Sequence, residues 1–425
     1  MPQPDRNSST AQRRGDVTES SPSAADSTRL GLFAANAAKL VGSGVVSALA
    51  LSVITSNRWH VLDPNVGVTL VLFMQWQILG LTLTKMGIDQ MIFAAITHDS
   101  AQKPDTRKHM LSRALPVSLI FAVLVVLVFG PWAGAACFAS LLFDTKAVLI
   151  LAELNAREKY TDVMIANMLN YPLFFALVFG LQLWTPVSLP LVFLVFVFTS
   201  FARWAWLSIA IRHETPLPER QFEGTVLSGL PPLLNLLLFR VDQVLLGTTA
   251  IMTLVATVGN DFVRQILFVD RYPEIVSGGL TALTGLLLPR LYLHYPFTIQ
   301  ELIASSAKRW WLIAVYVLIM VLPLALYALL WRGAPLSPIL LAAGAVSAIL
   351  ILPTNALTYS MIRQGYLRGL VRNLTIAVLT GLIVIAAGYA FRVPFGVVVA
   401  VPLQLLVFVV TTLVMSWRAG RQAGA

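Results

Sequence analysis

Two charged residues of opposite sign lie inside one of the most apolar stretches of the chain. Arg240 and Asp242 fall in the run LSGLPPLLNLLLFRVDQVLLG, from Leu227 to Gly247. A charged side chain at the centre of a membrane helix costs about 2.5 to 3.5 kcal/mol, so it must face a polar cavity or a partner. The two side chains point about 200° apart around a helix and therefore need different partners. They either serve function or hold neighbouring helices together.

Other charged residues also fall in apolar runs, and most of them are basic. Lys85 and Asp89 are four residues apart and share a helical face, so they either pair or form a cavity charge that a proton or sodium ion switches. Arg203 is flanked by tryptophans, and we expect its side chain to snorkel to the interface. The candidates besides the opening pair are Lys39, Lys85, Asp89, Asp144, Lys146, Arg203, Arg264, Asp270 and Arg271.

Several of these candidates leave alternatives open, and Asp144 and Lys146 have either a structural or a functional role. Arg264 and Arg271 are two helical turns apart and share a face, which lines a cavity or lies near the outer interface. Lys39 and Lys85 are both suitable counter-charges for Asp242. A cavity with excess positive charge suits an anionic substrate such as a diphosphate, whose hydration shell lysine and arginine side chains must replace.

The composition of the whole chain indicates where these charges lie. Of its 425 residues, 57% are hydrophobic and 12% are charged, and the mean hydropathy is +0.77. These values exclude a soluble domain and indicate a protein with many membrane spans. The apolar runs are too long for the strands of a membrane barrel, so we expect an all-α fold.

Hydropathy and turn residues predict twelve membrane helices. The basic residues support this number, because the predicted cytoplasmic segments hold about twenty Lys and Arg and the outer loops about three. Under the positive-inside rule, both termini are then cytoplasmic. The predicted spans begin near residues 31, 66, 114, 133, 163, 187, 225, 261, 310, 336, 368 and 394.

A polar connection in the middle of the chain divides these spans six and six. This arrangement is typical of transporters built from two related bundles with a substrate site between them. The predicted organisation is a disordered cytoplasmic tail (1–29), a first six-helix lobe (30–211), a cytoplasmic linker (212–224), a second six-helix lobe (225–416) and a cytoplasmic tail (417–425).

Several classes of function lack the residues that they need. The five histidines form no ligand spacing and Cys137 stands alone, so we expect no metal site and no other cofactor. No Walker motif is present, and the basic residues form no patch for nucleic acid. The predicted outer loops are too short for the catalytic acids of a membrane glycosyltransferase, so we expect no enzyme.

Several segments of the chain resemble one family of membrane proteins. The segments NAAKLVGSGVVSALALSVI, LDPNVG and ILGLTLTKMGIDQMI are similar to the start of the polysaccharide transporter family, the O-antigen and exopolysaccharide flippases. LPPLLNLLLFRVDQVLLG resembles its seventh span, and ATVGNDFVRQILFVDRYPEIVSGGLTALTGLLLPRLY resembles the next segment. The resemblance covers roughly residues 30 to 415, although Phe93, Ala94 and Ala95 stand where the family often has a basic residue.

The resemblance implies an exporter of the multidrug, oligosaccharidyl-lipid and polysaccharide superfamily, with two six-helix lobes that form a V and alternate in access. The implied substrate is a polyprenyl diphosphate-linked oligosaccharide, moved across a bacterial inner membrane and shared with a polysaccharide polymerase and glycosyltransferases. The alternative is a drug antiporter of the same superfamily, driven by H⁺ or Na⁺. We expect the substrate to be bound by Lys39, Lys85, Arg240, Arg264 and Arg271, with Asp89 and Asp242 as counter-charges or coupling groups.

Overall fold

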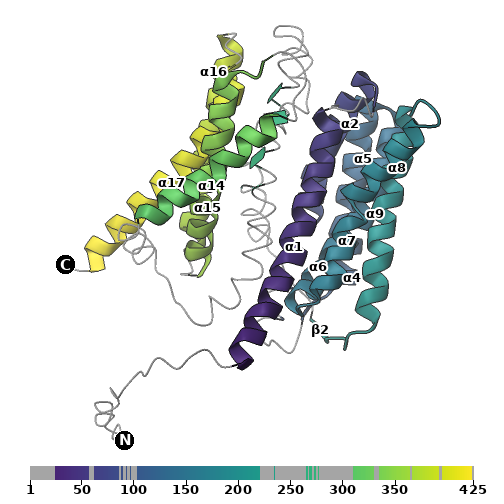
Figure 1. The fold of residues 1–425 in the computed structure, drawn as a ribbon, viewed down its shortest axis with the longest axis horizontal. Coiled ribbons are helices and arrows are strands. Elements are labelled where there is room, and N and C mark those ends of the chain that lie inside the picture. Colours follow the sequence, from purple (N-terminus) through teal and green to yellow (C-terminus); the bar gives the residue numbers. More distant parts are fainter. Residues whose placement is uncertain are drawn as a thin grey trace, which may run out of the picture.

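The computed structural model describes most of the first half of the chain and the last part of the second half. It describes residues 24–56, 62–85, 103–220, 310–329, 335–363, 366–391 and 395–423, with isolated positions at 88–89, 92, 96, 234, 265–266, 268–269, 272–273 and 276. Apart from two short strands, the elements in these ranges are helices. Figure 1 shows them as two bundles, with helix α1 (Ala24–Ser56) along the side of the first bundle that is nearer to the second.

The first bundle contains the helices up to residue 212. Two of its spans are composite: a short π-helix lies between α4 and α5, and a break at Leu169 and Asn170 separates α7 from α8. Pro172 at the start of α8 has no N–H to donate to the preceding turn, which explains the break. Besides α1, the elements are α2 (Pro64–Lys85), α4 (Thr106–His109), η1 (Met110–Ala114), α5 (Leu115–Phe129), α6 (Pro131–Ala156), α7 (Tyr160–Met168), α8 (Tyr171–Gln182) and α9 (Leu189–Arg212).

Among the described residues, four long helices belong to the second bundle. Three of them contain an internal proline, at Pro323, Pro353 and Pro402. Membrane helices tolerate such prolines because neighbouring groups satisfy the freed backbone carbonyls. The four helices are α14 (Trp310–Ala328), α15 (Pro338–Arg363), α16 (Leu367–Ala390) and α17 (Phe395–Ala423).

Close helix packing in the first bundle depends on a glycine turn and a small-residue contact. Gly130 has a φ of 89°, which lets the chain reverse between α5 and α6, and Pro131 then starts α6. In α6, a Cβ on Gly134 would lie 2.2 Å from Cγ2 of Val126 and 2.8 Å from the carbonyl oxygen of Ala122. The two helices therefore touch through backbone, as small residues allow in membranes.

The described helices support a protein with many membrane spans. Seven of the helices in these ranges are long and apolar enough to cross a membrane, and large apolar side chains such as Leu127, 77% exposed, cover the outside. Helices occupy ten of the twelve predicted spans, while the spans predicted near 225 and 261 fall on residues that are mostly outside the described ranges.

Helix extends into both predicted tails, so residues 24–29 are not the disordered segment that the sequence predicted. Helix α1 begins at Ala24, inside the tail predicted at 1–29, and α17 continues to Ala423, beyond the boundary predicted at 416. Hydropathy locates the apolar part of a helix, whereas a nucleated helix extends into polar sequence at little cost per residue. The structure therefore replaces part of each predicted tail with helix.

Candidate functional site

One of the cations predicted from the sequence, Lys39, lies on α1. Its ammonium donates a hydrogen bond to Thr161 Oγ1 on α7, at 3.0 Å. One turn further along α1, Ser43 Oγ accepts a hydrogen bond of 3.2 Å from the Asn167 side chain. Polar contacts thus connect α1 to α7. The Thr161 hydroxyl is neutral, so it does not neutralise the positive charge of the Lys39 ammonium.

Lys85 and Asp89 pair with each other, as one of the two sequence-based alternatives predicted. The Lys85 ammonium lies 2.9 Å from Asp89 Oδ2 at the end of α2. The other carboxylate oxygen of Asp89 is buried and has no hydrogen-bond partner. The pair is therefore neutral as a whole, and its predicted part in substrate binding or coupling stays a prediction.

Asp144, which the sequence left between a structural and a functional role, is the centre of a buried polar cluster. Its Oδ2 accepts hydrogen bonds from Gln77 Nε2 at 2.6 Å and from Ser200 Oγ at 3.1 Å. Its Oδ1 lies 4.0 Å from the Arg203 guanidinium. One carboxylate therefore connects α2, α6 and α9 in the interior of the first bundle.

The expectation that Arg203 snorkels to the membrane interface is wrong. The residue is only 8% exposed, and its guanidinium faces Asp144 inside the bundle. A buried charge needs a partner of opposite sign, and Asp144 on the neighbouring helix supplies one. The flanking tryptophans gave the wrong indication: Trp204 instead lies under the ammonium of Lys146, 5.3 Å from the ring centroid.

A second polar layer lies next to the Asp144 cluster. Thr84 and Thr145 hydroxyls are 2.8 Å apart, and Thr145 follows Asp144 directly on α6. A ring nitrogen of His109 lies 2.7 Å from the Thr84 backbone oxygen, at the point where α4 becomes the π-helix. This histidine is buried, and its ring nitrogen contacts the backbone of α2.

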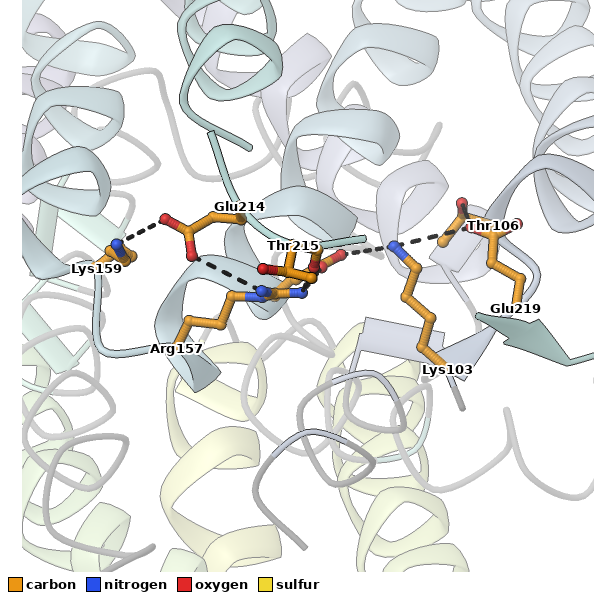
Figure 2. Close-up of polar contacts among 8 residues, drawn as sticks. Lys103, Thr106, Arg157, Lys159, Glu214, Thr215 and Glu219 are labelled. Carbon is orange, nitrogen blue, oxygen red and sulfur yellow. Dashed lines mark hydrogen bonds and ion pairs between the residues drawn. The ribbon is translucent and has the colours of Figure 1, made fainter. Parts of the chain in front are cut away.

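An ion-pair network at one end of the first bundle was not foreseen (Figure 2). Glu153 near the end of α6 accepts from Lys103 at 2.8 Å and from Arg157 at 2.7 Å. Arg157 also donates to the Thr215 carbonyl at 2.9 Å and lies 3.7 Å from Glu214. Glu214, just after α9, completes the network with an ion pair to Lys159 of 2.6 Å.

The same network fastens the start of the predicted inter-lobe linker to the first bundle. Strands β1 (Lys103–Pro104) and β2 (Glu219–Arg220) pair in parallel, and the Lys103 amide donates to the Pro218 carbonyl. Thr106 adds a hydrogen bond to the Glu219 carboxylate at 3.1 Å. In the predicted linker (212–224), the residues from His213 to Arg220 therefore lie against the first bundle.

Four of the predicted site residues lie outside the described residues: Arg240, Asp242, Arg264 and Arg271. The structure thus brings together Lys85 with Asp89 and places Lys39 separately on α1, and the proposed joint site stays a prediction. Sequence reasoning missed Gln75, Gln77 and Ser200 because it considered charged residues alone. Uncharged polar side chains in the apolar runs were the available signal. In the part of the chain that the structure describes, no cluster of metal-ligating side chains occurs.

The fold is that of known membrane transporters. The chain is similar to the crystal structure of a eukaryotic MATE transporter, AtDTX14, with a TM-score of 0.55 and 13% sequence identity over 90% of this chain and 95% of that chain. It is also similar to the MATE multidrug transporter DinF-BH in complex with R6G, with a TM-score of 0.56 and 15% identity over 91% and 95%. No protein-family model and no curated protein matches the chain. The likeness shows a fold shared with these MATE transporters, and the superfamily and the narrower flippase family stay predictions.

Proposed function

We propose that the protein is a flippase that moves a polyprenyl diphosphate-linked oligosaccharide from the cytoplasmic to the outer leaflet. In this proposal, twelve helices in two six-helix lobes alternate in access. The diphosphate and the sugars pass through a cationic cavity between the lobes, while the polyprenyl tail stays in lipid. The similarity of the fold to that of MATE transporters supports the proposal.

Lys39 is the observation that carries the proposal. The residue is partly buried on α1, and its hydrogen-bond partner is the neutral hydroxyl of Thr161. It forms no ion pair with a described residue, in contrast to Lys85, which Asp89 neutralises. An ammonium in a membrane protein needs an anionic partner, and a substrate diphosphate supplies one.

The α2 helix offers a second supporting feature for a sugar-bearing substrate. Gln75 is buried, and both its amide oxygen and its amide nitrogen have no hydrogen-bond partner. It is two residues from Gln77 and so points about 200° away from the Asp144 cluster. A primary amide both donates and accepts, which matches the hydroxyls of a sugar.

The remaining roles follow the sequence. Arg240, Arg264 and Arg271 would add guanidinium groups for the diphosphate, since arginine binds phosphate oxygens with two parallel N–H groups. Asp89 and Asp242 would serve as counter-charges or as groups that couple transport to H⁺ or Na⁺. The glycosyltransferases that build the substrate and the polymerase that consumes it would be the partners.

One comparison favours a second candidate function, a drug antiporter. The MATE multidrug transporter DinF-BH has the same fold and was solved with R6G. A site for cationic drugs would call for net negative charge, whereas the intramembrane charges of this chain are mainly positive. The two candidates therefore differ in the sign of the substrate that the cavity accepts.

The test is transport by the purified full-length protein in proteoliposomes. We expect a fluorescent polyprenyl diphosphate-linked oligosaccharide to be translocated, with a rate that falls about tenfold or more in Lys39→Gln and in Arg240→Ala. Lys39→Arg should retain most of the rate because it keeps the charge. The matched control is Lys108→Gln, which removes a cation from an exposed position on α4.

Two outcomes would overturn the flippase proposal. One is a translocation rate in a folded Lys39→Gln protein equal to that of the wild type. The other is uptake of a cationic dye against a proton or sodium gradient with no translocation of the labelled glycan, which would establish the antiporter instead.

A further inference from the structure

A groove on the outer surface of the first bundle has no place in the transport proposal. It has a volume of about 580 Å³ and lies between the α4–η1–α5 span, α6 and α9. Leu111 and Leu115 at its edge are 62% and 41% exposed, so the groove opens to the surface that surrounds the bundle. In a membrane protein, this surface is in contact with lipid.

The walls of the groove are mainly aliphatic. Leu142 and Ile150 on α6 and Ile211 on α9 continue the surface that Leu111 and Leu115 begin. A chain of CH₂ groups along such walls makes close van der Waals contacts with aliphatic side chains that would otherwise have no partner on one side. The apolar part of the groove therefore suits an acyl chain.

The polar part of the groove is cationic. Lys103, Arg107 and Lys146 line it, and Glu153 is the acid among its lining residues. Glu153 is already occupied, because its two oxygens accept from Lys103 and Arg157. Arg107 and Lys146 are exposed, and within the part of the chain that the structure describes they form no ion pair. The groove therefore presents two positive charges that no carboxylate neutralises.

The depth of Lys146 makes this charge significant. The residue lies ten positions before the end of α6 at Ala156, which is about 15 Å along a helix. The helix is one of those long and apolar enough to cross a membrane, so the ammonium reaches the groove from well within the span. The Trp204 ring, 5.3 Å away, stabilises the cation without neutralising it.

We propose that this groove binds an anionic phosphoglyceride of the surrounding bilayer. The phosphate is held by Arg107 and Lys146, and an acyl chain lies along Leu111, Leu115 and Leu142. Lipid phosphate is the anion that a bilayer supplies at this surface, and the two unneutralised cations match its charge. The lipid is a bound component on the outside of the bundle, separate from the proposed substrate cavity between the lobes, and no described residue of α1 lines its groove.

The test is native mass spectrometry of the purified full-length protein with added phosphatidylglycerol or phosphatidylcholine. We expect phosphatidylglycerol to bind in preference, and its apparent affinity to fall about tenfold or more in the double variant Arg107→Gln, Lys146→Gln. Leu111→Trp, which keeps both charges and fills the apolar wall, should weaken binding as well. Lys108→Gln changes a neighbouring cation that does not line the groove, and this variant should bind as the wild type does.

Each other outcome would overturn the proposal. Equal binding of the two lipids, or unchanged binding in the double variant, would show that the cations do not hold the headgroup. Binding of inorganic phosphate that Leu111→Trp leaves intact would identify a free-anion site. Displacement of phosphatidylglycerol by a polyprenyl diphosphate at equimolar amounts would make the groove a substrate site. The double variant is also assayed for glycan translocation, and normal transport with lost lipid binding separates this proposal from the proposed function.

Discussion

The carboxylate of Asp144 on α6 and the guanidinium of Arg203 on α9 face each other in the interior of the first bundle, 4.0 Å apart. Both residues are almost completely buried. Gln77 and Ser200 donate hydrogen bonds to the other oxygen of the carboxylate, Oδ2, whereas Oδ1 faces Arg203 without a hydrogen bond. Asp144 and Arg203 are therefore counter-charges of each other, although in the sequence they appear as two isolated charges in separate apolar runs.

We predict that Arg203→Met destabilises the protein by about 3 to 5 kcal/mol, since it leaves the Asp144 charge buried without a counter-charge. The double variant Asp144→Asn, Arg203→Met should recover most of this loss, because asparagine still accepts from Gln77 and carries no charge. Thermal unfolding of the detergent-purified protein measures both. A double variant as unstable as Arg203→Met would show that the pair does not account for the effect.

Glu153 holds Lys103 and Arg157 together at the base of the first bundle. We predict that Glu153→Gln releases the segment after α9, because glutamine has no negative charge to pair with Lys103 and Arg157. A hydrogen bond to a charged group contributes about 1.5 to 3 kcal/mol to stability. Trypsin should then cut after Arg212 and Arg220 faster than in the wild type. Limited proteolysis followed by mass spectrometry measures the rate.

The matched control for this prediction is Glu219→Gln. The Glu219 side chain is 37% exposed, and its distance to the Lys103 ammonium is 3.8 Å, so its ion pair contributes little. Cleavage in the control should remain close to that of the wild type. Equal acceleration in the two variants would mean that the buried pairs of Glu153 are not what fastens the segment.

Gly134 lets α6 approach α5 at backbone distance. We predict that Gly134→Ala lowers the temperature of unfolding, because the new Cβ would lie 2.8 Å from the Ala122 carbonyl oxygen and 2.2 Å from Val126 Cγ2. Gly180 on α8 is the control, since a Cβ there meets nothing within 4 Å. Gly180→Ala should leave stability unchanged or raise it by up to about 1 kcal/mol, as expected for alanine in a helix. Tolerance of both substitutions would contradict the close contact.

The residues that the sequence placed correctly are those whose partners are local. The Lys85 and Asp89 pair follows from a spacing of four residues, which brings side chains together in any α-helix. The apolar runs likewise determined where membrane helices occur, because runs this long can satisfy their backbone hydrogen bonds in a bilayer only as helices. The sequence by itself thus determined a mostly helical membrane protein and the positions of ten helical segments among the described residues.

Only the tertiary structure decided which distant residues meet. Asp144 and Gln77 are 67 positions apart, Asp144 and Ser200 are 56 apart, and Lys103 pairs with Glu153 across 50 positions. Which helix faces of α2, α6 and α9 lie together depends on side-chain packing over the whole bundle, a property that no local spacing contains. Arg203 illustrates the difference. In the sequence, the tryptophans beside it indicate a residue of the membrane interface, whereas in the structure it faces the buried carboxylate of Asp144 on the neighbouring helix.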